Sequence, residues 1–154
     1  MSTHLEEILD KKKKQMEEQG KNWDAERNQW LKKNKGLFDI IKKWISPLEV
    51  KGYISISTSD HTITEQLLGT YHALVLTITF FSGEKVHLVP KGLNIISGKG
   101  RVDLKFGMRE IMIVGQDEDP GWFFAEREGR GKPRQFEFNK ENFEQLMREY
   151  LESA

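Results

Sequence analysis

The amino-acid sequence predicts an α+β protein, an antiparallel β-meander that forms a curved sheet or small barrel, with a helical arm before it and an amphipathic helix after it. Two observations predict this arrangement. In the middle of the chain apolar and polar residues alternate, which is the two-residue period of a β-strand. About seven short runs show this alternation. Both ends instead carry apolar residues at helical spacing. We therefore divide the chain into an arm, residues 1–46, and a β domain, residues 47–154, that ends in a helix over 140–152.

The clearest strands lie at the centre of the chain. The run 73–81 alternates apolar residues with threonines, and a Ser-Gly link joins it to the run 84–89. Two such runs with a short glycine-containing link are typical of a β-hairpin. Pro90 has no N–H to donate, so the second strand ends there or lies at a sheet edge. The run 101–106 and the apolar residues of 111–113 predict the next pair of strands.

Strands are also expected on both sides of this centre. A first strand is predicted over about 49–58, followed by a polar turn over 58–62. The pattern of 63–68 fits a short helix or another strand equally well. Further along, aromatic residues predict strands over 122–127 and 135–138, separated by a glycine-rich basic loop.

The final helix has the strongest helical signal of the chain. Asn139 is a good N-cap residue. After it, apolar side chains recur at helical spacing on one face, at Phe143, Leu146, Met147, Tyr150 and Leu151. This helix is expected to close over the sheet. The order of strands followed by a capping helix resembles that of pleckstrin-homology-like barrels, a resemblance of element order that implies no function.

The arm carries a seven-residue repeat of apolar residues, the spacing that keeps one helix face toward a partner. The repeat consists of Leu9, Met16, Trp23, Trp30, Leu37 and Trp44. The second apolar stripe that a coiled coil needs is missing. Gly20 and Gly36 each cost about 1 kcal/mol within a helix, so they are expected to divide the arm into three pieces. Ser46-Pro47 is expected to end the last piece.

Two interpretations of this stripe remain open. In the first, the arm lies on its own domain. In the second, the stripe contacts another chain, through Trp23, Trp30, Leu37 and Trp44, because tryptophan is over-represented at binding hot spots. The lysine run 11–14 is interpreted as a solvated face, with contact to nucleic acid or a membrane as its alternative.

The composition limits the function classes. The chain has 24 basic and 24 acidic residues, so no overall field recruits nucleic acid or anionic membrane. It has no cysteine, which excludes disulfides, cysteine-based zinc sites and thiol chemistry. No window is apolar enough for a membrane span or a signal peptide. We expect a cytoplasmic protein.

The nearest approach to an acid–base or metal cluster is Asp60-His61 with Glu65, with His72 further along. None of the paired-histidine spacings of a metal site occurs. These side chains are interpreted as solvated or hydrogen-bonded surface groups. We expect no cofactor and no metal, and we lean against an enzyme; an enzyme with an unfamiliar site near Asp60-His61 is an alternative.

Two basic loops suggest a different alternative, contact with phosphate or nucleic acid. The loop 98–101, and the loop 129–134 with the nearby Arg127, contribute Lys99, Arg101, Arg127, Arg130, Lys132 and Arg134. The neutral total charge makes nucleic acid a poor candidate.

Three function classes follow. We expect a non-catalytic interaction or adaptor protein that uses its tryptophan-bearing arm to bind another protein or itself, with an oligomer such as a homodimer as the result. The alternatives are a phosphate or nucleic-acid binder and an enzyme.

Overall fold

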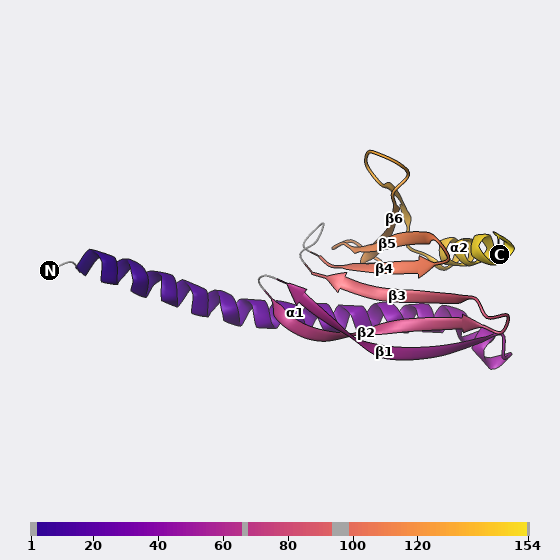
Figure 1. Cartoon of the computed structure of the whole chain (residues 1–154), viewed down its shortest axis with the longest axis horizontal. Helices are drawn as coiled ribbons and strands as arrows, with labels where there is room; N and C mark the ends of the chain where they lie inside the picture. The colour runs from indigo at the N-terminus through magenta and orange to yellow at the C-terminus, as the bar shows by residue number, and fades with distance from the viewer. Residues whose placement is uncertain (1–2, 66–67, 94–98, 154) are drawn as a thin grey trace.

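The computed structural model describes residues 3–65, 68–93 and 99–153. Within these ranges the chain forms two helices and a sheet, in the order α1 (Thr3–Val50), β1 (Ile54–Glu65), β2 (Gly69–Phe80), β3 (Lys85–Gly92), β4 (Arg101–Phe106), β5 (Arg109–Gly115), β6 (Trp122–Glu126), β7 (Arg134–Glu137) and α2 (Lys140–Ser153). The sheet is antiparallel throughout, and its strands lie in sequence order. This confirms the predicted α+β architecture (Figure 1).

The sheet is curved and open. Among the described residues β1 and β7 stand at the two ends of the strand order and do not pair with each other. The barrel form of the prediction is therefore not adopted, and the resemblance to pleckstrin-homology-like barrels does not extend beyond the order of elements.

α1 runs without a break through Gly20 and Gly36, so the predicted division of the arm into three pieces is wrong. A glycine lowers the stability of a helix interior by only about 1 kcal/mol. The continuous hydrogen bonding of a 48-residue helix, and the packing of its second half on the sheet, outweigh that cost. The segment around Gly36 is anchored on both sides by buried residues, Trp30 and Ile41.

The end of α1 also differs from the prediction. Pro47 lies inside the helix, and the residues predicted to begin the first strand instead complete its last turn. The helix ends in a Schellman motif. Gly52 has a left-handed φ of 78°; its N–H donates to Glu49 O at 3.0 Å, and the Tyr53 N–H donates to Leu48 O at 3.0 Å. A glycine that satisfies the last carbonyls, rather than the proline, sets the boundary.

β1 and β2 form a long ribbon in which Ile54 pairs with Phe80 and Glu65 pairs with Gly69. The predicted polar turn over 58–62 is wrong, because these residues pair with 72–76 as strand. They are polar because β1 is an edge strand and most of these side chains are exposed. The strand alternative holds for 63–65; residues 66–67 lie outside the described ranges.

The ribbon of β1 and β2 is joined to the rest of the sheet over only part of its length. β2 pairs with β3 only from Leu76 to Thr79, and in Figure 1 the free half crosses over α1. Two-stranded ribbons twist strongly, so different faces of the ribbon meet α1 along its length. Near one end Ile54 and Ile78 are buried, and near the other Ile63 and Tyr71 are buried.

The meander from β3 to β7 follows the prediction with small shifts of the strand ends. The hairpin between β2 and β3 is confirmed, and the Gly83 N–H donates to Phe80 O at 2.8 Å. β3 continues through Pro90 to Gly92. Beyond Leu88, β3 pairs only with β4. On its other side no strand needs a hydrogen bond from position 90, so a proline without an N–H is tolerated there.

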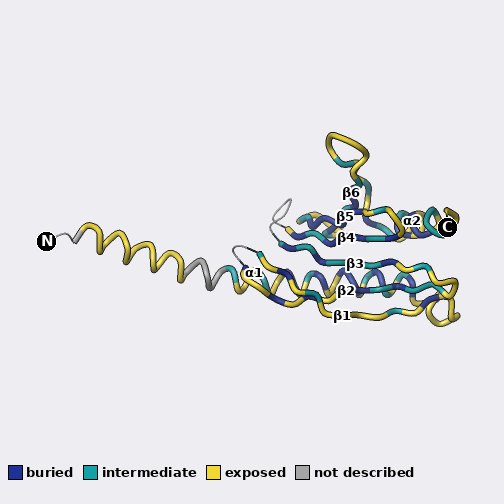
Figure 2. The backbone as a smooth tube through the Cα atoms, in the orientation of Figure 1, coloured by how far each residue is buried: buried dark blue, intermediate teal, exposed yellow. Residues whose placement is uncertain are grey.

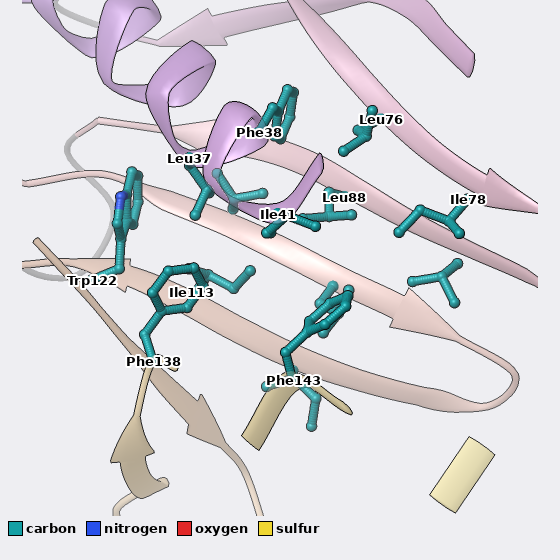
Figure 3. Packing of buried hydrophobic residues seen from close by; sticks show 14 of the residues in the cluster. Leu37, Phe38, Ile41, Leu76, Ile78, Leu88, Ile113, Trp122, Phe138 and Phe143 are labelled. Carbon is teal, nitrogen blue, oxygen red and sulfur yellow. The ribbon is translucent and has the colours of Figure 1, made fainter. Parts of the chain in front are cut away.

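α2 forms as predicted. The Asn139 side-chain oxygen accepts the backbone N–H of Asn142 at 2.8 Å, which is an N-cap bond. Phe143, Leu146 and Met147 are buried. They join a single core with residues of the sheet and of the second half of α1. Figure 3 shows side chains from both helices and the sheet meeting in this core.

Candidate functional site

Residues 4–17 project from the body as the free end of α1 (Figures 1 and 2). We call residues 4–17 the projecting arm. All of its side chains are exposed. They include four large apolar residues, Leu5, Ile8, Leu9 and Met16, of which Met16 is 72% exposed. Leu9 and Met16 begin the seven-residue repeat. The projecting arm therefore presents an apolar stripe that none of the described residues covers.

The remainder of the repeat packs on the chain itself. Trp30 and Leu37 are buried in the core. Trp44 is half-buried, with its ring centroid 4.9 Å from that of Phe138. Trp23 is partly buried against the same core. In this structure the second half of α1 thus lies on its own domain, as in the first of the two interpretations.

Trp30 is held at both its polar and apolar parts. Its ring lies against Gly100, where an added Cβ would overlap the six-membered ring. The ring centroid of Trp122 is 6.3 Å away. The indole N–H donates a hydrogen bond to the Tyr71 hydroxyl at 3.0 Å. These contacts explain why Trp30 serves as an anchor of α1.

The first basic loop has its charges paired with carboxylates. Lys99 lies 3.1 Å from Asp117. Arg101 forms two hydrogen bonds to the fully buried Asp103, from Nε at 2.6 Å and from Nη2 at 3.0 Å. A guanidinium held in this way is not directed at a phosphate in solution. Gly98 lies outside the described residues.

The second basic loop is exposed and connects β6 to β7. Arg127, Arg130 and Lys132 are exposed. Arg134 lies at the start of β7, 3.1 Å from Glu128, and its guanidinium stacks 4.7 Å from the ring centroid of Phe136.

The two basic loops lie at opposite ends of the sheet. β4 and β6 are both antiparallel to β5 and hence run in the same direction. The loop of Lys99 precedes β4, whereas the loop of Arg130 follows β6. The structure therefore does not bring the predicted phosphate-contact residues together.

The residues of the predicted acid–base cluster separate into two groups. Glu65 accepts hydrogen bonds from the Tyr71 hydroxyl at 2.6 Å and from the Leu93 N–H at 3.0 Å. It is part of the contact between the ribbon and the core. Asp60 and His72 instead line a cavity between α1 and the ribbon, whose lining does not include His61 or Glu65.

This cavity contains a residue that the sequence did not single out. Asn34 of α1 lines it and is only 4% exposed, yet neither its side-chain nitrogen nor its oxygen has a hydrogen-bond partner among the described residues. A signal was present in the sequence. Asn34 stands four residues after Trp30 and three before Leu37, which is a core position on the helix face that carries both.

The chain matches no protein-family model, no curated protein and no solved structure. In the part of the chain that the structure describes, neither helix is long and apolar enough to cross a membrane. The described residues also contain no group of three or more His, Asp or Glu placed to hold a metal ion.

Proposed function

We propose that this protein is a non-catalytic interaction protein, and that its projecting arm pairs with the projecting arm of a second copy. The observation that supports the proposal is the uncovered apolar stripe on a helix whose other half is packed in a core. Exposed large apolar residues at helical spacing are typical of a helix that docks against another helix.

The charge pattern of the arm favours a second copy in the antiparallel direction. Glu6, Glu7 and Asp10 precede the lysine run 11–14. Glu6 and Lys13, seven residues apart, lie on the same flank of the stripe. Two arms that run antiparallel, with residues 10 and 11 at the midpoint, place Glu6 within one helical turn of Lys13 of the second copy. The same register places Leu5 level with Met16 of the second copy. A parallel pair would set the lysine run against itself, which repels.

The same pattern disfavours an anionic membrane as the occupant. The projecting arm has four lysines and four carboxylates, so it carries no net positive charge to attract one. Membrane-surface helices combine their apolar face with an excess of lysine and arginine. A protein helix with alternating charge blocks suits this arm better.

Sedimentation velocity of the full chain over a range of concentrations tests the proposal. We expect a concentration-dependent dimer, which the double variant Leu9→Ala, Met16→Ala weakens at least tenfold because it removes apolar surface from the stripe. Alanine favours the helix, so the arm stays helical. The matched control Glu17→Ala changes an exposed residue away from the stripe and leaves the dimer unchanged.

Charge reversal tests the direction of pairing. Lys13→Glu should weaken the dimer, and adding Glu6→Lys should restore it, because the two antiparallel pairs are then reversed rather than lost. A chain that stays monomeric at all concentrations, in wild type and variants alike, contradicts the proposal. A dimer that ignores the stripe variants but responds to changes in the sheet places the interface elsewhere.

A further inference from the structure

Asn34 occupies a position where an apolar residue would be expected. The sheet-facing side of α1 is otherwise apolar at this level, with Trp30 and Leu37 buried on either side of it. A buried amide group that makes no hydrogen bond destabilises the fold, because it has lost its hydrogen bonds to water and formed none within the protein. Among the described residues Asn34 has no partner for either polar atom. Such a group in an otherwise consistent helix face points to a role outside folding.

Asn34 lines a cavity of about 310 Å³ between α1 and the ribbon of β1 and β2, although its two polar atoms are themselves covered by neighbouring atoms. Leu31 and Phe38 of α1 and Leu74 of β2 form apolar walls. The volume is at the lower end of the range for small-molecule sites, which are mostly apolar with a few converging polar groups.

The charges at the cavity favour a neutral ligand. Lys35 and Lys42 contribute two positive charges, and Asp39 and Asp60 contribute two negative ones. This balance gives neither an anion nor a cation an advantage. His72 also lines the cavity.

We propose that this cavity binds a small neutral molecule that carries a cis-amide edge, meaning a carbonyl oxygen and an N–H side by side. The carboxamide of Asn34 has the complementary edge. When a rotation of the side chain turns this edge toward the cavity, Nδ2 donates to the ligand carbonyl and Oδ1 accepts from the ligand N–H. Lactam rings such as pyrimidine bases and cyclic dipeptides present this edge. The trans-amide of a peptide main chain does not, because its donor and acceptor point in opposite directions.

The test is an NMR titration of the ¹⁵N-labelled full chain with uracil, with the cyclic dipeptide of glycine, and with N-methylacetamide as the trans-amide probe. We expect uracil or the cyclic dipeptide to shift the side-chain NH₂ signals of Asn34 in a saturable manner. The probe that binds more tightly shows whether the natural ligand is a pyrimidine base or a cyclic dipeptide. N-methylacetamide should leave these signals in place.

Two variants refine the result. Asn34→Leu should weaken binding at least tenfold while the rest of the spectrum shows a folded chain. Gln29→Leu makes the same chemical change at an exposed residue outside the cavity and should leave binding unchanged. The wild-type Asn34 signals report directly, so the test does not depend on either variant folding.

Three outcomes overturn the proposal. The first is that neither lactam moves the Asn34 signals up to its solubility limit. The second is that the Asn34→Leu variant binds as tightly as wild type. The third is that a long-lived water contacts the Asn34 amide and persists in the presence of the probes, since water is then its partner.

Discussion

The indole N–H of Trp30 donates a hydrogen bond to the hydroxyl oxygen of Tyr71 at 3.0 Å. Tyr71 in turn donates to Glu65 at 2.6 Å, and Glu65 accepts the backbone N–H of Leu93 at 3.0 Å. This chain of bonds joins α1, both strands of the ribbon and the segment that follows β3. Burial, followed by the hydrogen bond to Glu65, raises the pKa of Tyr71 well above its ordinary value of 10.0. The tyrosine therefore keeps its proton, and with it the hydrogen bond to Glu65, at pH values where an ordinary tyrosine ionises.

Removal of the Tyr71 hydroxyl should lower the stability of the fold. Tyr71→Phe leaves the buried Trp30 N–H without its acceptor, and a buried donor left unpaired costs about 1–3 kcal/mol. Urea denaturation followed by tryptophan fluorescence measures the loss. The control Tyr53→Phe removes the hydroxyl of an exposed tyrosine and should change stability by less than about 0.5 kcal/mol. Equal effects of the two changes would contradict the structural role of the network.

An ion pair between the sheet and α2 predicts a pH dependence. Arg109 forms two hydrogen bonds to Glu126, from Nε at 2.7 Å and from Nη2 at 2.9 Å. It also reaches Glu149 of α2 at 3.3 Å. The hydrogen bond from Arg109 is the largest cause that lowers the pKa of Glu126 below its ordinary value of 4.5. Glu126 is thus more easily ionised in the folded chain than in the unfolded chain.

The sign of the effect follows from this lowered pKa. The pair contributes its full stability above pH 4.5, and the contribution is lost as the pH falls through the folded pKa of Glu126. We expect Arg109→Gln to cost about 1–2 kcal/mol at pH 7 and less at pH 3, which is below 4.5. Urea denaturation at both pH values measures the difference. A cost that is the same at pH 3 and pH 7 would rule out ionised Glu126 as its origin.

Two glycine substitutions with equal space around them should have opposite effects. An added Cβ meets no atom within 4 Å at Gly36 or at Gly52. Gly36 lies inside α1, so Gly36→Ala should stabilise by about 0.4–1 kcal/mol, since alanine is the better helix former. Gly52 has a φ of 78°, and Gly52→Ala should destabilise by about 1–2 kcal/mol. Thermal unfolding followed by circular dichroism compares them, and a shift of the same sign in both would be inconsistent with a continuous helix that ends at Gly52.

Asn34→Leu should stabilise the fold. It replaces an unpaired buried amide by an apolar side chain of similar size on the helix face that carries Trp30 and Leu37. Relief of the unmet hydrogen bonds is worth about 1–3 kcal/mol, measured by urea denaturation. Gln29→Leu, at an exposed position, should change stability little. A less stable Asn34→Leu variant would indicate that the amide is already satisfied in the folded chain.

The number and order of strands, and the boundaries of α2, followed from the sequence. These features depend on neighbouring residues: the alternation within a strand, the Ser-Gly link before β3, the Asn139 cap and the apolar spacing after it. Each of these signals acts over a few residues, so the chain itself carries it whatever lies around it.

Only the tertiary structure decided the course of α1, the strand character of 58–62 and the location of the candidate sites. Gly36 and Pro47 are locally unfavourable in a helix, yet packing against the sheet outweighs them. The polar residues 58–62 become strand because β2 supplies hydrogen bonds from a different part of the chain. Asn34 is exposed or buried according to which face of α1 meets the ribbon. Such outcomes depend on contacts between residues far apart in sequence, and no local pattern contains the free energy of those contacts.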